Sequence, residues 1–259
     1  MSGVKRLLFD LETSPNIGLF WRAGYKQTIT PESILEERAI ICLGYKWEGS
    51  KAVHAVEWDD GNDKAICEKF GELVLEADEI VGHNSNRFDF PWLATRNLVH
   101  GLPPLRIPTM VDTLAMARKR FYFNSNKLDY IAQFLGIEGK HDTDFGMWKD
   151  IMLHKCNDAM AKMVSYCMND VKILEKVYHK LREYDPMSTH TGAHIGNGRW
   201  SCPQCGSQHV KKNKGRTTPM GMERHEMFCH DCGRHYSIAN PAFNKYKEEK
   251  LSRASPPSV

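Results

Sequence analysis

Two acidic residues near the start of the chain have a spacing suited to metal binding. Asp10 and Glu12 lie two residues apart in the apolar run KRLLFDLET. Side chains at positions i and i+2 of a strand share one face, so both carboxylates would leave a sheet side by side. Two adjacent buried anions repel each other unless a cation lies between them. Taken alone, the same pair could simply face water at a strand end.

Acidic residues in two later stretches could complete such a site. Asp89 lies in HNSNRFDFPWL, between a short apolar run and a helical pattern, where an aspartate is also a common helix cap. Tyr166 and Asp170 lie four residues apart in SYCMND, a spacing that places both on one face of a helix. Each stretch alone is a weak indication of a site.

Four cysteines near the C-terminus form a second constellation. Cys202 and Cys205 make one C-x-x-C pair, Cys229 and Cys232 make another, and 23 residues separate the pairs. Each pair is followed by glycine, which permits the tight turn of a metal-binding knuckle. Four thiolates fill a tetrahedral Zn²⁺ site and leave no open position for catalysis. We therefore predict one structural zinc ion, which supplies most of the folding energy of this small module.

The elements that must position these residues follow from the apolar patterning. It predicts strands at 5–11, 39–47, 51–58 and 79–84, and helices at 63–77, 90–101, 127–135 and within 158–184. A strand end and a helix start are expected within 109–120. In this order, three strands are followed by alternating helices and strands. Such an order predicts an α/β sheet with helices packed on it.

Composition divides the chain into parts. We predict a main domain at 1–186, a polar linker at 187–199, a zinc module at 200–238 and a charged, disordered tail at 239–259. Residues 187–259 hold 11 Lys+Arg against 5 Asp+Glu, or +6, whereas 1–186 hold 24 against 27, or −3. A basic end on an acidic body favours a polyanionic partner, although it could also only aid solubility.

The sequence offers nothing that would place the chain in a membrane. No run approaches the roughly 18 apolar residues of a spanning helix, and the N-terminus lacks the features of a signal peptide. We expect a cytoplasmic protein, and a nucleoid-associated protein or a viral origin is compatible with the sequence.

Taken in order, the acidic motifs resemble a known family. LLFDLET, GHNSNRFDF and YCMND strongly resemble the three exonuclease motifs of the DEDD superfamily, and the tyrosine marks its DEDDy branch. That branch includes ribonuclease D and the proofreading domains of family-B-type polymerases. The resemblance covers residues 4–184 and implies a ribonuclease-H-like mixed sheet flanked by helices. The C-terminal cysteine pattern resembles a zinc ribbon.

The resemblance implies a role for each site residue. Asp10 would bridge two divalent ions, Glu12 and Asp170 would hold the ion that activates water, and Asp89 would serve the ion at the leaving group. Hard carboxylate oxygens suit Mg²⁺ or Mn²⁺. Tyr166 would orient the nucleophile, since a phenol with a pKa near ~10 is a poor base at neutral pH.

Other residues are candidates for nucleic-acid contact. Asn84 and Phe88 could contact the terminal nucleotide. A basic cluster between the cysteine pairs could bind the phosphate backbone, namely Lys211, Lys212, Lys214 and Arg216. The alternatives are a solvated loop or a docking surface for a replication or repair protein.

Together these features predict a metal-dependent 3′–5′ exonuclease acting on single-stranded DNA. One alternative is a 3′–5′ exoribonuclease, because the motifs do not show whether any residue contacts the 2′-hydroxyl that distinguishes RNA from DNA. Another is a nucleic-acid-binding adaptor with an inactive nuclease fold, which the presence of all four acids and the tyrosine argues against.

Overall fold

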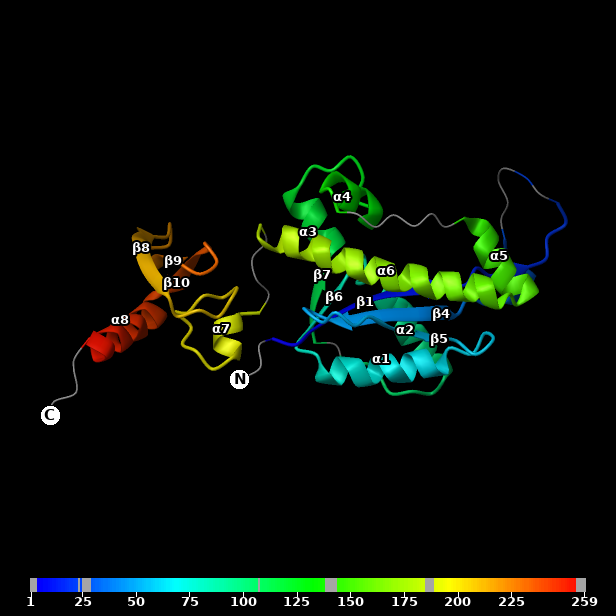
Figure 1. The fold of residues 1–259 in the computed structure, drawn as a ribbon, viewed down its shortest axis with the longest axis horizontal. Helices are drawn as coiled ribbons and strands as arrows, with labels where there is room; N and C mark the ends of the chain where they lie inside the picture. The colour runs from blue at the N-terminus through cyan, green and yellow to red at the C-terminus, as the bar shows by residue number, and fades with distance from the viewer. Residues whose placement is uncertain are drawn as a thin grey trace. The chain divides into compact units, whose positions relative to one another are not determined.

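The structure is a computed structural model that describes residues 4–22, 24, 29–106, 108–137, 144–184 and 189–254. The chain divides into two compact units, one formed by Lys5–Asp185 and the other containing Pro186–Val259 (Figure 1). Each unit has its own hydrophobic core. They are therefore considered separately.

A five-stranded mixed sheet is the centre of the first unit, in the order β5-β4-β1-β6-β7. Its strands are β1 (Arg6–Thr13), β4 (Ile40–Trp47), β5 (His54–Glu57), β6 (Glu79–Gly82) and β7 (Thr109–Asp112). β1 is antiparallel to β4 and parallel to β6. The remaining short elements are β2 (Ile17–Gly18), a 3-10 turn (Pro31–Ser33) and β3 (Ile34–Glu36).

Helices cover both faces of this sheet (Figure 1). They are α1 (Lys64–Glu76), α2 (Asp89–Val99), α3 (Thr113–Arg120), α4 (Leu128–Phe134), α5 (Phe145–His154) and α6 (Asn157–Arg182). This arrangement confirms the predicted mixed α/β class. The helical pattern predicted within 158–184 corresponds to α6, a single helix of 26 residues. The sequence analysis did not predict α5.

Alternation along β1 decides which helices each face contacts. Leu7, Phe9 and Leu11 pack in one core with α1 and α2. Leu8 belongs to a second core with α3, α4 and α6. Because Asp10 and Glu12 share the parity of Leu8, the period of two in the strand directs them to the face that α6 covers.

The second unit is a three-stranded antiparallel sheet with two helices. Its elements are α7 (Thr191–His194), β8 (Val210–Thr217), β9 (Glu223–Cys229), β10 (His235–Ala239) and α8 (Asn240–Ala254). Trp200, Met227 and Phe243 are the largest side chains of a small buried core. Such a core is too small to stabilise the unit without further support.

Two boundaries differ from the prediction. The expected linker at 187–199 is structured over 189–199, where Thr191 N donates to Pro203 O at 2.8 Å and Asn197 Nδ2 donates to Gly206 O at 2.8 Å. Hydrogen bonds of the backbone and of the Asn197 side chain hold this stretch, rather than apolar residues with a helical or strand period, so its composition suggested a linker. Residues 185–188 lie outside the described range.

The expected disordered tail at 239–259 is also wrong for most of its length. α8 continues to Ala254, and Phe243 is buried against His225, with ring centroids 3.8 Å apart. Only a few apolar residues anchor this charged helix, which is why its composition predicted disorder. Residues 255–259 lie outside the described range.

Candidate active site and metal centre

Three of the predicted acids meet between β1 and α6. Asp10, Glu12 and Asp170 each offer a carboxylate oxygen, and these oxygens all lie within 4.8 Å of one another. Asp10 and Glu12 come from one face of β1, and Asp170 comes from α6. Acids that are separated by about 160 residues in the chain therefore form a single cluster that could hold divalent cations.

Asp89 lies outside this tight group but acts on it electrostatically. It is the first residue of α2 and is 2% exposed. Its negative charge raises the pKa values of Asp10 and Glu12. Its Oδ1 atom is buried and has no hydrogen-bond partner among the described residues. A buried carboxylate oxygen without a donor is costly and would be satisfied by a cation.

Desolvation and neighbouring negative charges raise the pKa values of Asp10, Glu12 and Asp89. Burial, together with the charges of Asp89, Glu12 and Asp170, raises the pKa of Asp10 well above its ordinary value. Burial and then the charges of Asp170 and Asp89 raise the pKa of Glu12 to about 8. Burial raises the pKa of Asp89 to about 7. The raised pKa values show that it is costly to ionise these carboxylates together at neutral pH. A divalent cation bound among them would offset that cost.

Tyr166 lies one helical turn before Asp170 on α6, as the spacing predicted. Burial and the negative charges of Asp170 and Glu12 raise the pKa of its hydroxyl above the ordinary value, and the hydroxyl hydrogen-bonds Asp170. The phenol therefore stays protonated at neutral pH. It can position an oxygen nucleophile by a hydrogen bond, but it cannot serve as a base.

Gly44 of β4 lets α6 approach the sheet beneath the acids. It pairs with Asp10 in the β1–β4 register. A Cβ atom at position 44 would lie 3.0 Å from both the carbonyl oxygen and the Sγ atom of Cys167, closer than such contacts ordinarily allow. Since Cys167 lies between Tyr166 and Asp170, glycine at this position sets how near these two residues come to β1.

Asp112, which the sequence analysis did not single out, fixes the turn before Asp89. Its carboxylate accepts hydrogen bonds from Asn84 N at 3.0 Å and from Leu114 N at 2.9 Å, so it joins this turn to the start of α3. Asn84 has a positive φ of 66° that the hydrogen bond stabilises. In the sequence, Asp112 resembles an ordinary helix cap, and no local signal reveals its second partner.

The two predicted nucleotide-contacting residues of this unit lie in the same turn. Asn84 O accepts a hydrogen bond from Phe88 N at 3.0 Å, and both side chains are half-buried. Phe90, by contrast, is 6% exposed and packs against Phe9 and Phe70, so it belongs to the core. Asn84 and Phe88 thus lie in the turn that leads into Asp89, and each is partly exposed to solvent.

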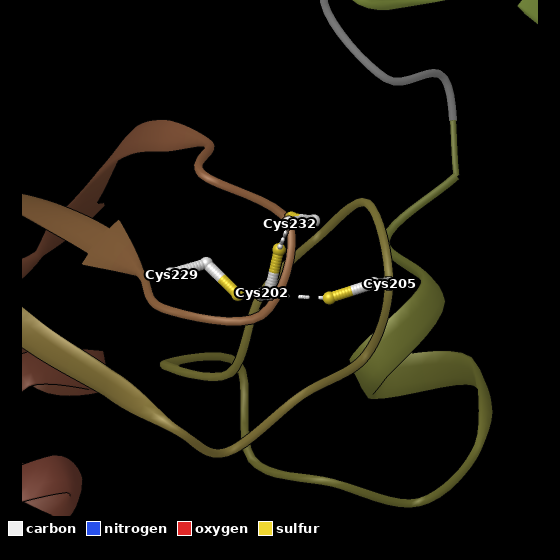
Figure 2. Close-up of side chains that lie close together, drawn as sticks. All are labelled: Cys202, Cys205, Cys229 and Cys232. Atoms are coloured by element: carbon white, nitrogen blue, oxygen red, sulfur yellow. Dashed lines mark hydrogen bonds between the residues drawn. The ribbon is translucent and has the colours of Figure 1, made fainter.

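The four cysteines of the second unit also converge (Figure 2). Their sulfur atoms all lie within 4.8 Å of one another. The Sγ atoms of Cys202 and Cys232 are 3.5 Å apart, and those of Cys205 and Cys229 are 3.6 Å apart. Sulfurs around a tetrahedral zinc ion with bonds of about 2.3 Å would be about 3.8 Å apart. The cluster therefore fits a four-thiolate zinc site.

The two cysteine turns have the same backbone pattern. Gly206 N donates to Cys202 O at 2.9 Å, and Gly233 N donates to Cys229 O at 3.0 Å. Both glycines have positive φ, at 78° and 73°. A side chain would strain either turn, which explains why glycine follows each pair.

The predicted basic cluster divides into two environments. Lys214 and Arg216 face Glu226 of the neighbouring strand, with nitrogen–oxygen distances of 3.8 and 2.7 Å. Lys211 and Lys212 instead lie over aromatic rings, those of Phe228 and Phe243. The charges of the first pair are thus partly neutralised within the unit.

Metal-free protein should lose stability as the pH rises. The folded state holds the pKa of Glu12 at about 8 and that of Asp89 at about 7, against ordinary values of 4.5 and 3.8. Between these values the folded protein binds more protons than the unfolded chain, so its free energy of unfolding falls with pH. For zinc-loaded protein without Mg²⁺ or Mn²⁺, we expect the melting temperature to fall by at least about 4 °C from pH 5.5 to 8.

Calorimetry with and without Mn²⁺ would measure this effect. Mn²⁺ should raise the melting temperature more at pH 8 than at pH 5.5. Glu12→Gln should flatten the pH profile, whereas Glu57→Gln, an exposed residue of β5, should leave it unchanged. A melting temperature that is independent of both pH and Mn²⁺ would contradict the proposed cation site.

A mixed sheet with an acidic cluster between its central strand and a long helix defines a ribonuclease-H-like nuclease fold. The RNase_H superfamily model RNase_H_2 matches residues 34–182. The chain therefore belongs to the RNase H superfamily.

Two DNA polymerases share part of this chain. DNA polymerase 2 of Aeropyrum pernix is 30% identical over 104 residues, which cover 39% of this chain and 11% of that protein. The structure of the family B DNA polymerase from the hyperthermophilic archaeon Pyrobaculum calidifontis matches with a TM-score of 0.51 and 17% identity. That match covers 84% of this chain and 31% of the polymerase chain. The chain thus spans only a small part of either polymerase.

None of the helices in the described ranges is long and apolar enough to cross a lipid bilayer.

Proposed function

We propose that this protein is a 3′–5′ exonuclease that hydrolyses phosphodiester bonds at the 3′ end of single-stranded DNA. The observation that carries the proposal is the convergence of Asp10, Glu12 and Asp170 within 4.8 Å, with the buried Asp89 charge acting on the same group. Membership of the RNase H superfamily supports a nuclease. The named relatives are DNA polymerases, which favours DNA over RNA.

The donor set fits two Mg²⁺ or Mn²⁺ ions. We assign Asp10 to both ions, Glu12 and Asp170 to one, and Asp89 to the other. When bound, such ions supply a nucleophilic oxygen at neutral pH and neutralise charge on the leaving 3′ oxygen. Asp89 is suited to its part because its unpartnered Oδ1 atom is free to accept a ligand.

The remaining residues would bind and orient the substrate. Tyr166 now hydrogen-bonds Asp170 through its protonated hydroxyl. When Asp170 holds an ion, this hydroxyl would donate its hydrogen bond to the attacking oxygen instead. Asn84 and Phe88 would contact the terminal nucleotide from the turn before Asp89. In the second unit, Cys202, Cys205, Cys229 and Cys232 would hold one structural zinc ion.

Digestion of end-labelled oligonucleotides tests the proposed activity. With Mg²⁺ or Mn²⁺, a 5′-labelled single strand should give a ladder that shortens from the 3′ end, and a 3′-labelled strand should release mononucleotide at once. Tyr166→Phe should lower kcat by about 10–100-fold, because it removes one orienting hydrogen bond, and should leave KM unchanged.

Parallel RNA substrates and a variant outside the site complete this test. Tyr122→Phe, at a fully exposed position, should retain wild-type kcat. Faster digestion of RNA than of DNA would identify an exoribonuclease instead. Absence of any metal-dependent cleavage would leave a nucleic-acid-binding adaptor as the better interpretation.

A further inference from the structure

A groove in the second unit lies between α8, the start of β8 and the second cysteine turn, Cys229–Cys232. Its volume is about 560 Å³, and its lining includes His209, Lys211, His230, Tyr246, Lys247 and Lys250. α8 contributes the last three of these residues, in the segment that the sequence predicted to be disordered. The groove therefore exists only because this helix packs on the sheet.

Three lysines give the groove a positive charge. Acids also lie near the groove. The Asp231 carboxylate accepts hydrogen bonds from His209 at 2.9 Å and Ser207 at 2.6 Å. Glu248 and Glu249 lie between Lys247 and Lys250 on α8, and Glu249 accepts a hydrogen bond from Trp200 Nε1 at 2.9 Å. Lys211, Lys247 and Lys250 are exposed, and none of them forms an ion pair with a residue in the described ranges. The lysine charges are consequently available to a ligand, unlike those of the hairpin residues that face Glu226.

Aromatic rings hold these lysines in place. The ammonium of Lys247 lies 5.2 Å from the ring centroid of Phe243, and that of Lys250 lies 5.9 Å from the centroid of Tyr246. Lys211 lies 5.6 Å from the centroid of Phe228. Such cation–π contacts restrict the lysine side chains, so less conformational entropy is lost when an anion binds.

The groove also offers a flat surface for a base. His209 and His230 stack with ring centroids 4.6 Å apart and planes inclined by 23°, and both residues are exposed. Phe228 packs edge-on against His230 and supports the pair. An exposed, supported pair of aromatic rings can stack with a nucleobase of any identity.

We propose that this groove binds the phosphate backbone of single-stranded nucleic acid, with Lys211, Lys247 and Lys250 contacting phosphates and His209 stacking with a base. A basic groove combined with a stacking surface is the combination that non-sequence-specific single-strand binding uses. The excess of +6 in residues 187–259 agrees with a polyanionic ligand. This inference deepens the proposed function, because it assigns the second unit a surface for the same substrate class.

Fluorescence anisotropy with a labelled oligothymidylate tests the groove in the full-length, zinc-loaded protein. Without Mg²⁺ or Mn²⁺ no cleavage interferes with binding. Lys247→Ala/Lys250→Ala should weaken binding at least tenfold at 50 mM salt. Loss of two phosphate contacts should also reduce the slope of log K against log salt by about 1.4. His209→Ala should weaken binding about threefold to tenfold.

Two comparison variants make the result specific. Lys64→Ala/Lys245→Ala removes the same charge outside the groove and should change affinity less than twofold. Lys214→Ala/Arg216→Ala should have a smaller effect than the groove pair, because Glu226 partly neutralises these two residues. A larger loss from the hairpin pair than from the groove pair would overturn the proposal. Zinc content and melting temperature of each variant show whether the unit remains folded.

The outcomes separate this proposal from the proposed activity. If the groove variants lose binding but the wild type cleaves nothing, the groove assignment holds and the exonuclease proposal fails. If cleavage occurs and the groove variants bind normally, the groove assignment fails alone. If polyglutamate at an equal concentration of charge displaces the oligonucleotide, the groove binds acidic polymers in general. That result would also overturn the assignment of the groove to nucleic acid.

Discussion

Replacing Asp10 with asparagine is expected to lower kcat for oligonucleotide hydrolysis by at least about 10³-fold, a loss of about 4 kcal/mol of transition-state stabilisation. A carboxylate oxygen of Asp10 lies within 4.8 Å of a carboxylate oxygen of Glu12 and of one of Asp170. Asp10 is also the residue that we assign to both ions. Asparagine keeps the shape of the side chain but removes its charge. Single-turnover kinetics with saturating Mn²⁺ would measure the effect on the chemical step.

The stability of the same variant distinguishes a catalytic effect from misfolding. Because neighbouring charges and burial disfavour the Asp10 carboxylate, its removal should maintain or raise the melting temperature of the metal-free protein. Asp150→Asn, an exposed residue of α5, should retain full activity. A well-folded Asp10→Asn protein with wild-type kcat would exclude the proposed site.

Removal of zinc should unfold the second unit and spare the first. The buried core around Trp200 is small, and zinc binding to four thiolates contributes an apparent free energy of about 10–16 kcal/mol in small zinc modules. Cys202→Ser/Cys229→Ser removes two ligands that are both fully buried. Hydrogen exchange should then become fast across residues 189–254, while β1 and α6 remain protected.

A matched substitution controls for the loss of a thiol. Cys67→Ser changes a buried cysteine of α1, outside both clusters, and should leave the second unit protected from exchange. Retained protection of residues 189–254 in the Cys202→Ser/Cys229→Ser protein would show that the unit folds without the metal.

Local patterns were sufficient to place most of the acidic cluster. The period of two along β1 puts Asp10 and Glu12 on one face, and the spacing of four on α6 puts Tyr166 beside Asp170. Local patterns do not show that β1 and α6 lie next to each other. That contact was expected only because the order of the motifs resembles a known family. The position of Asp89 outside the closest group could not be read from the sequence, since it depends on where α2 begins relative to β1.

Features that depend on contacts between distant segments were missed. From the sequence, Asp112 was expected at most to cap α3. Its hydrogen bond from Asn84 N exists because β6 and β7 lie side by side. Likewise, the charged stretch that forms α8 has low apolar content, and its packing against Trp200 and His225 depends on the fold of the second unit. Composition describes the average environment of a segment and does not reveal the few residues that anchor it.

Titration of Mn²⁺ into the zinc-loaded protein, followed by electron paramagnetic resonance, tests the central claim most directly. In the presence of a phosphorothioate oligonucleotide, we predict two bound Mn²⁺ ions per wild-type chain and loss of at least one ion in Asp10→Asn. Equal Mn²⁺ binding by the two proteins would contradict the assignment of the acids at β1 and α6 as the metal site.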